Sequence, residues 1–369
     1  MIQTSLRELF SNIRKSSDKW ELYLDVYEGL FAPFRGRPIS ILEIGIQNGG
    51  FTEVLAAYFP NAVKIVGCDI DEKCGSLVAS DPRISVVIGD AIDAGTAGRI
   101  KEISDSFDIV IDDGSHRSKD IIAAFCRYFP LLREDGVFIA EDLHCSYWHE
   151  YEGGLAHQFS SISFFKLLSD VVNYEHWGLS YPRTRLLSDM FQHHSCEISD
   201  DVLETIFSVT FCNSMSIVRK KAASAVLLGE RVIGGTEFAV ADNAPHNHSH
   251  AARNDQRGNP FSDLDLITNK HVFGLFVALL NANSKLSVDH ARLAEQLQAV
   301  SFGIAESQQN QQSWIVEPLA SLSSNLETAQ GNNHKEIVER LALLTSDVET
   351  IKQKNTFFDW LRVKIGSGS

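Results

Sequence analysis

Short apolar runs alternate with helix-length amphipathic stretches over the first 150 residues. Each run is bounded by Gly, Asp or Pro, and its nearly continuous apolar character is typical of a strand buried on both faces. The amphipathic stretches 49–59 and 118–132 predict helices. The alternation predicts an α/β fold with a parallel sheet covered on both sides. The strands are expected at 39–45, 62–70, 84–90, 107–113 and 136–142.

The pattern loosens after residue 150. The stretch 159–174 predicts a further helix, and 206–220 predicts two strands joined by a turn at Asn213 and Ser214. A hairpin at this place would close one edge of the parallel sheet with an antiparallel strand.

Four regions follow from these changes in pattern. Residues 1–37 predict an N-terminal helical segment and 38–220 the sheet domain. Residues 221–262 are rich in Gly, Asn, Pro and His and predict a linker. In 263–365, Leu, Val and Ile recur at alternating steps of four and three, which predicts a helical coiled-coil region. An ordinary helical bundle is the alternative, and the apolar seam favours a homo-oligomer or a partner helix.

The charge and the distribution of apolar residues disfavour several classes of function. The chain has 33 Lys and Arg against 48 Asp and Glu, a formal net charge of −15, which disfavours binding to nucleic acid. No apolar stretch is long enough to span a membrane. The N-terminus lacks the apolar core of a secretory signal. We therefore expect a cytoplasmic protein, peripheral at the inner membrane only through a partner.

A glycine-rich turn follows the first predicted strand. Gly45, Gly49 and Gly50 stand between that strand and the helix that begins at once, where glycines let a ligand approach the backbone closely. The spacing is GxxxGG and not the GxGxxG of dinucleotide-binding proteins, so a nicotinamide cofactor is disfavoured.

Acidic residues stand at the ends of the next two strands. Asp69 lies 24 residues after Gly45, where a carboxylate can accept hydrogen bonds from ribose hydroxyls. Asp90 and Ala91 end the third strand, where a side chain can meet an adenine ring. Acids at strand ends also serve as helix caps, but a polar residue at each successive strand end favours a nucleoside-containing cofactor.

A second acidic group stands at the ends of the fourth and fifth strands. Asp112 and Asp113 end the fourth, and Glu141 and Asp142 end the fifth. Carboxylates that converge on one crevice repel one another unless a cation lies between them, and oxygen ligands suit Mg²⁺. His116 follows Asp113 by three residues, and an imidazole there can take a proton from a hydroxyl group.

The segments LEIGIQNGG, CDID and GDA, with the hairpin at 206–220, resemble the class I S-adenosylmethionine-dependent methyltransferases. The resemblance covers residues 15–220 and implies a Rossmann-like seven-stranded sheet whose last strand is antiparallel. The S-adenosylmethionine-binding methyltransferase domain would then be 38–220. By this resemblance the cofactor-binding residues are Glu43 at the loop or amino group, Gly45 and Gly49 at the methionine part, Asp69 at the ribose, Asp90 and Ala91 at the adenine, and Asp112.

The strings IDDGSH and AEDLHCSYW narrow the resemblance to metal-dependent sugar O-methyltransferases of the macrolide-sugar and cephalosporin-hydroxylase-like group. The stretch SSDKW, with Tyr23 and Tyr27, is similar to the TDK…Y…Y segment of that group, although Ser17 replaces its Thr. The resemblance implies that Asp113, Glu141 and Asp142 hold Mg²⁺ or another divalent cation. It implies that His116 is the general base.

The sequence thus predicts an S-adenosylmethionine- and Mg²⁺-dependent O-methyltransferase acting on a sugar hydroxyl of a glycan or glycosylated natural product. A methyltransferase followed by a coiled coil also resembles bacterial enzymes that cap O-antigen chains, which implies a polysaccharide acceptor and a glycosyltransferase partner. The alternatives are a phenolic or other small-molecule O-methyltransferase, and a non-catalytic cofactor-binding scaffold that acts through its coiled coil.

Overall fold

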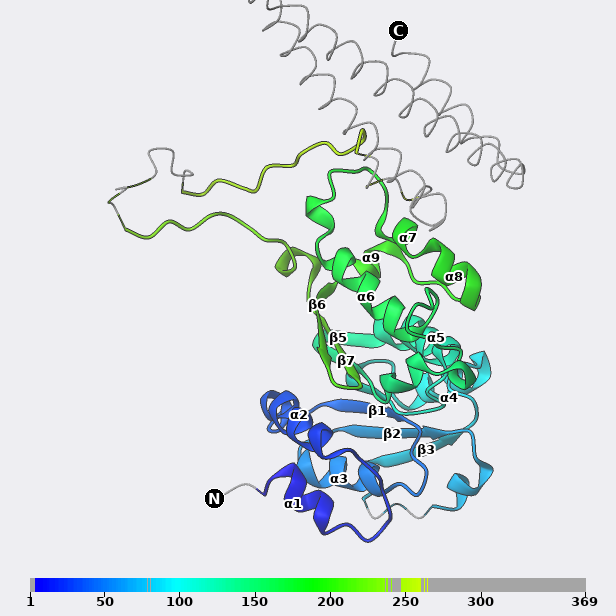
Figure 1. The fold of residues 1–369 in the computed structure, drawn as a ribbon. Coiled ribbons are helices and arrows are strands. Elements are labelled where there is room, and N and C mark those ends of the chain that lie inside the picture. Colours follow the sequence, from blue (N-terminus) through cyan, green and yellow to red (C-terminus); the bar gives the residue numbers. More distant parts are fainter. Residues whose placement is uncertain are drawn as a thin grey trace, which may run out of the picture. The chain divides into compact units, whose positions relative to one another are not determined.

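The structure is a computed structural model that describes residues 4–259, apart from 78, 80, 236, 238, 239 and 241–246, together with 262 and 264 (Figure 1). Residues 1–259 form one compact unit and 260–369 a second. The predicted coiled-coil region 263–365 lies outside the described residues apart from Leu264, so it stays a prediction.

A seven-stranded sheet organises the first unit, in the order β3-β2-β1-β4-β5-β7-β6 (Figure 1). Only β7 runs antiparallel to its neighbours β5 and β6. This confirms the expected α/β methyltransferase-type sheet in which the last strand of the chain is antiparallel, and β7 lies second from the edge of the sheet, next to β6. The strands are β1 (Ser40–Ile44), β2 (Lys64–Asp69), β3 (Ile84–Ile88), β4 (Phe107–Asp112), β5 (Leu132–Ala140), β6 (Ile206–Cys212) and β7 (Met215–Lys220).

Alternate residues of the strands enter two different cores. Leu42, Val110 and Phe138 belong to the core on one face, together with α4, α5 and α6. Ile41 and Ile109 belong to the core on the other face, together with α1, α2 and α3. Because successive strand side chains point to opposite faces, burial of both sets explains the continuous apolar runs.

Helices and short 3-10 turns cover both faces, and within the described residues no helix has the length and apolarity needed to cross a membrane. Their bounds are α1 (Leu6–Ser11), α2 (Glu21–Phe31), η1 (Ala32–Phe34), α3 (Gly50–Tyr58), η2 (Glu72–Ser76), α4 (Ala94–Ile103), α5 (Ser118–Tyr128), η3 (Phe129–Leu131), η4 (Leu143–Tyr147), η5 (His149–Tyr151), α6 (Ser161–Val172), η6 (Tyr174–His176), α7 (Arg183–Leu186), α8 (Ser188–His194), α9 (Asp200–Leu203) and η7 (Ala223–Ala225).

The strand registers bring the predicted site residues to one edge of the sheet. Ile44 of β1 pairs with both Cys68 of β2 and Asp112 of β4, and Asp112 pairs with Ala140 of β5. The carboxyl ends of four parallel strands are therefore level with one another. The residues that follow each strand meet above this edge, which is where α/β proteins bind ligands.

The segment between α1 and α2 crosses the N-terminus of α3. A Cβ atom at Gly50 would lie 2.5 Å from the carbonyl oxygen of Lys15 and 2.7 Å from that of Ser16, so only glycine permits the approach. The ammonium of Lys15 pairs with Glu53 of α3 at 2.9 Å. This packing carries Lys19 and Trp20 to the carboxyl edge of the sheet.

The segment expected as a linker returns to the body of the first unit after η7. The backbone N–H of Gln256 donates to the carbonyl of Gly178 at 3.0 Å. The backbone N–H of Arg231 donates to the carbonyl of Ser249 at 2.8 Å. The part of 221–259 that the structure describes contains no strand and no helix beyond η7.

Candidate active site

A cavity of about 240 Å³ lies at the ends of β1, β2, β3 and β4. Gln47, Ser115 and Asp120 line it in addition to residues predicted for the cofactor. Of the seven predicted cofactor residues, Gly45, Asp69, Asp90, Ala91 and Asp112 line this cavity, whereas Glu43 and Gly49 do not.

The glycine turn shapes one wall of the cavity. Gly45 has a φ of 86°, and a Cβ atom there would overlap the carbonyl group of Asp113. Gly49 has a φ of 75° and is the N-cap of α3. Both positions need the left-handed backbone conformation that glycine adopts without strain. Glu43 lies buried beside this turn, where its carboxylate accepts a hydrogen bond of 2.6 Å from Thr52 Oγ1.

Asp69 and Asp112 both line the cavity, but their carboxylates differ in the hydrogen bonds that they accept. Asp69 accepts backbone N–H groups from Gln47 at 2.8 Å and Asp71 at 2.9 Å. Asp112 Oδ1 accepts from Gly114 N at 3.3 Å, but the buried Asp112 Oδ2 has no partner. Burial raises the pKa of Asp112 to about 7. An orphaned buried acceptor is costly, and a ligand that donates a hydrogen bond or carries positive charge would satisfy it.

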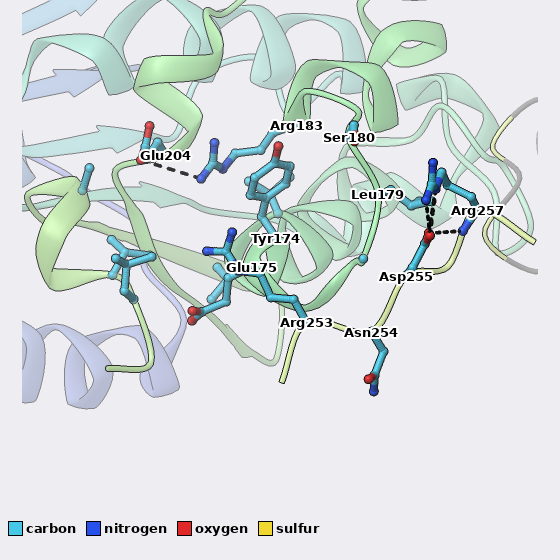
Figure 2. A pocket seen from close by; sticks show the side chains of 16 residues that line it. Tyr174, Glu175, Leu179, Ser180, Arg183, Glu204, Arg253, Asn254, Asp255 and Arg257 are labelled. Atoms are coloured by element: carbon cyan, nitrogen blue, oxygen red, sulfur yellow. Dashed lines mark hydrogen bonds and ion pairs between the residues drawn. The ribbon is translucent and has the colours of Figure 1, made fainter. Parts of the chain in front are cut away.

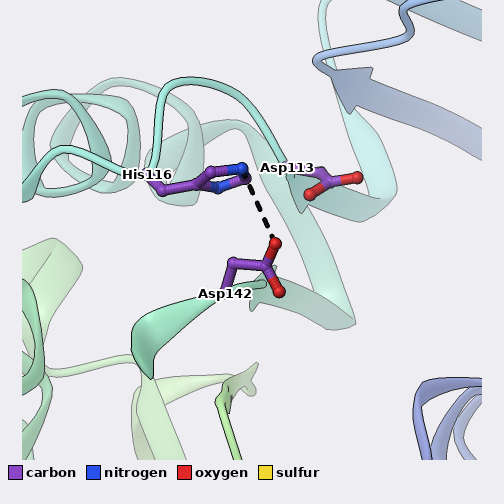
Figure 3. A group of neighbouring side chains, drawn as sticks. All are labelled: Asp113, His116 and Asp142. Carbon is purple, nitrogen blue, oxygen red and sulfur yellow. Dashed lines mark ion pairs between the residues drawn. The ribbon is translucent and has the colours of Figure 1, made fainter. Parts of the chain in front are cut away.

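Asp113, His116 and Asp142 form a cluster of neighbouring side chains (Figure 3). One ligand-type atom from each lies within 4.8 Å of the others. His116 Nε2 is 3.6 Å from Asp142 Oδ2. Burial lowers the pKa of His116 below its ordinary value, although Asp142 acts in the opposite direction. The imidazole is therefore neutral at pH 7 and able to accept a proton.

The backbone conformation at this cluster is unusual. His116 has a φ of 57° and Asp142 a φ of 52°, both in the left-handed region. Non-glycine residues rarely adopt it, and such conformations concentrate at functional sites. Asp113 also lines the cofactor-type cavity, so the cluster and the cavity are continuous.

Glu141 is buried beside this cluster. Its side chain is 1 % exposed, and Lys19 Nζ donates to its Oε1 at 2.7 Å. The same ammonium bonds Asp113, and Tyr27 donates its hydroxyl to Glu141 Oε1. Burial alone would lower the pKa of Lys19, but attraction to Glu141, Asp113 and Glu43 outweighs it and raises that pKa above its ordinary value. Lys19 is thus a charged cation within the acidic group.

Lys19 and Tyr27 received no role from the sequence. Both stand in the stretch that resembles the TDK…Y…Y segment, but spacing alone did not indicate that they reach Glu141, 122 and 114 residues away. One feature of the sequence could have indicated a basic residue at this site: several acidic residues close together need a cation between them.

A separate cavity of about 760 Å³ lies beyond α6, between η6, η7 and residues 253–257 (Figure 2). Its charged groups largely pair among themselves. Arg183 stacks on Tyr174, with its guanidinium carbon 3.9 Å from the ring centroid, and pairs with Glu204 at 3.9 Å. Asp255 pairs with Arg257. The strand ends, where Asp112 Oδ2 has no partner and the cluster contains two left-handed residues, are therefore the better candidate for chemistry.

The chain is similar to several known methyltransferases. Residues 23–167 match the model of the FtsJ-like methyltransferase family. The 8-demethyl-8-alpha-L-rhamnosyl tetracenomycin-C 2'-O-methyltransferase of Streptomyces olivaceus is 30 % identical over 222 residues, covering 58 % of this chain and 54 % of that protein. The demethylmacrocin O-methyltransferase of Streptomyces fradiae is 33 % identical over 157 residues, covering 40 % of this chain and 38 % of that protein.

The fold also matches a solved structure, that of the MycE methyltransferase from the mycinamycin biosynthetic pathway in complex with Mg, SAH and mycinamycin VI. The TM-score is 0.50 at 24 % identity, covering 66 % of this chain and 58 % of that one. The chain spans about half the length of the curated relatives it matches. The FtsJ-like methyltransferase match thus falls on residues 23–167, which hold strands β1 to β5 and the acidic cluster.

Proposed function

We propose that this protein is an S-adenosylmethionine- and Mg²⁺-dependent O-methyltransferase that modifies a sugar hydroxyl of a glycosylated acceptor. The observation that carries the proposal is the continuity between the cofactor-type cavity and the Asp113, His116 and Asp142 cluster. A methyl donor in the cavity and an acceptor at the cluster would be adjacent, so proximity would supply much of the rate enhancement.

The cavity suits S-adenosylmethionine by the chemistry of its walls. Asp69 would accept hydrogen bonds from the ribose hydroxyls. Asp90, beside Ala91, would accept a hydrogen bond from the adenine amino group. The orphaned Asp112 Oδ2 suits a hydrogen-bond donor or a cation, and the cofactor carries both. Gly45 would leave room for the methionine part, whereas Gly49, which does not line the cavity, would act through the turn that it caps. The role proposed for Glu43 is indirect. Its carboxylate accepts a hydrogen bond from Thr52 of α3 and so stabilises the glycine turn that precedes this helix.

The cluster suits a divalent cation because two carboxylates face one space. Asp113 and Asp142 would hold Mg²⁺, which prefers oxygen ligands and leaves positions for water and substrate. Glu141 as a third ligand stays a prediction. Its Oε1 already accepts hydrogen bonds from Lys19 and Tyr27. Bound S-adenosylmethionine would supply a sulfonium methyl group, and a bound cation would lower the pKa of the acceptor hydroxyl.

His116 would act as the general base. Its imidazole is neutral at pH 7, and it would accept the proton that the acceptor hydroxyl loses as the oxygen attacks the methyl carbon. Asp142, 3.6 Å away, would then stabilise the imidazolium. Lys19 would remain protonated and hold Asp113 and Glu141 in place.

The acceptor class rests on the relatives. Two curated relatives act, by their names, on rhamnosyl compounds: the tetracenomycin 2'-O-methyltransferase named above and the 8-demethyl-8-(2-methoxy-alpha-L-rhamnosyl)-tetracenomycin-C 3'-O-methyltransferase of Streptomyces olivaceus, which is 36 % identical over 182 residues. A deoxyhexose glycoside is therefore the first acceptor to test. An O-antigen chain end, an oligomer and a glycosyltransferase partner depend on the predicted coiled coil and stay predictions.

The test is methyl transfer from labelled S-adenosylmethionine to a panel of rhamnosides and phenols, with Mg²⁺ or with a chelator. We expect transfer to a rhamnoside that Mg²⁺ supports and a chelator abolishes. Transfer to phenols alone would favour the small-molecule alternative. Cofactor binding without transfer to any acceptor would favour the non-catalytic scaffold.

A further inference from the structure

Two cysteines from distant parts of the chain lie in contact with each other. Cys126 belongs to the second half of α5, and Cys196 is the second residue after α8. The thiol of Cys126 donates a hydrogen bond to Cys196 Sγ, with 3.7 Å between the two sulfur atoms. Both are free thiols, and neither has a part in the chemistry described above.

The packing around the two residues holds them in this contact. Cys126 is 6 % exposed and lies in the core on the α5 face of the sheet, to which Met190 of α8 also belongs. Ser195 ends α8 in the left-handed conformation, with a φ of 53°. The backbone N–H of Cys196 then donates to the carbonyl of Phe191 at 3.2 Å. The turn after α8 thus keeps Cys196 against this core and beside Cys126.

The two thiols differ in the way that a redox pair requires. Cys196 is partly exposed, and the hydrogen bond from Cys126 lowers the pKa of its thiol. The same hydrogen bond, together with burial, raises the pKa of Cys126. Burial also raises the pKa of Cys68 to about 12 and that of Cys145 to about 11. Because the thiolate is the form that reacts with oxidants, we expect Cys196 to react first and Cys126 to resolve the product.

We propose that Cys126 and Cys196 form a reversible disulfide when the protein is exposed to hydrogen peroxide. A disulfide holds its sulfur atoms about 2.0 Å apart, so closure needs a movement of about 1.7 Å from the observed contact. Asp120 and Ala124 of α5 line the cofactor-type cavity. The bond would therefore tie the helix that borders this cavity to the end of α8. The inference does not depend on the proposed function.

The oxidation balances in two steps. The thiolate of Cys196 attacks one oxygen of the peroxide, the O–O bond breaks, and hydroxide leaves, which gives a sulfenic acid on Cys196. The sulfur of Cys126 then attacks Cys196 Sγ, the S–O bond breaks, and the oxygen leaves as water with the proton of the Cys126 thiol. The first hydroxide takes up the proton that Cys196 lost. The two thiols are oxidised by two electrons, and the peroxide is reduced to two molecules of water.

Peptide mapping after mild oxidation tests the proposal. The full chain is reduced, freed of reductant and treated with one molar equivalent of hydrogen peroxide, and the remaining thiols are alkylated before digestion and mass spectrometry. The variants are Cys126→Ser, Cys196→Ser and the matched control Cys212→Ser, which removes the other partly exposed cysteine. Because the wild-type map identifies the linked cysteines directly, the test does not require that every variant folds.

We expect the wild type to lose two of its six thiols and to yield a peptide that links Cys126 to Cys196, both changes being reversed by dithiothreitol. Cys212→Ser should form the same bond. Cys196→Ser should consume peroxide at least about tenfold more slowly, and Cys126→Ser should stop at a sulfenic acid on Cys196 that dimedone traps. Six intact thiols in the treated wild type, a bond between other cysteines, a bond that forms only in urea, or equal rates for wild type and Cys196→Ser would overturn the inference.

Discussion

The ammonium of Lys19 lies 2.7 Å from Oε1 of Glu141 and also bonds Asp113, so one buried cation joins the ends of β4 and β5. Its side chain is only 2 % exposed. The segment between α1 and α2 is thereby anchored to the acidic group. This contact makes the N-terminal part of the chain a structural part of the candidate site.

Replacement of Lys19 should cost more stability than replacement of Lys15 on the same segment. Lys19→Met leaves the buried Glu141 and the partly buried Asp113 without their cation, and loss of one partner of a buried ion pair costs about 3–5 kcal/mol. Lys15→Met removes the more exposed pair with Glu53 and should cost about 1 kcal/mol or less. Chemical denaturation without metal measures both. Equal stability of the two variants would refute the anchoring role.

His116→Ala should reduce kcat about 10²–10⁴-fold and leave S-adenosylhomocysteine affinity unchanged, because a general base acts on the acceptor alone. His149→Ala, at an exposed position, is the control. Because burial lowers the pKa of His116 below 6.5, wild-type kcat should fall as the pH drops below that value and the imidazole gains a proton. An alanine variant that keeps its turnover would remove His116 from the mechanism.

Asp113→Asn and Asp142→Asn should each weaken Mn²⁺ binding by at least about tenfold, because each removes a charged oxygen ligand. Asp105→Asn, an exposed acid before β4, is the matched control. Calorimetry or Mn²⁺ resonance measures the affinity without any need for turnover. A cation that binds all three variants equally lies somewhere other than this cluster.

The free energy of unfolding should fall as the pH rises, because of the buried carboxyl group of Glu43. Burial raises its pKa to about 7, above the unfolded value of 4.5, so the folded state holds the proton more firmly. The stabilisation is complete below the unfolded pKa and is lost as the pH rises through 7. Between pH 6 and 8 the loss is about 1.4 kcal/mol. Glu43→Gln should remove this part of the pH dependence in denaturation of the ligand-free protein.

The sheet and the residues at its strand ends could be predicted from the sequence, because strands buried on both faces consist of apolar runs that end at polar residues. The runs that end at Asp69 and Asp112 correspond to β2 and β4. The directions of adjacent side chains did not follow. Glu141 and Asp142 were grouped together, but their carboxylates have different partners, because Glu141 pairs with Lys19 and Asp142 lies 3.6 Å from His116.

Long-range pairing was equally out of reach of pattern analysis. Lys19 and Trp20 stand in a stretch without helical or strand periodicity, and their partners lie more than 90 residues away. Gly50 is the one local sign of the crossing segment, because its missing Cβ makes room for the backbone at Lys15. Read alone, that glycine indicated only a ligand-binding turn.

Calorimetric titration with S-adenosylhomocysteine tests the central claim, that the strand ends form a methyltransferase cofactor site. Wild type and the remote control Asp105→Ala should bind with micromolar affinity, and Asp69→Ala should bind at least about tenfold more weakly, because it loses the acceptor proposed for the ribose. Absence of binding by the wild type, or equal binding by Asp69→Ala, would contradict the claim.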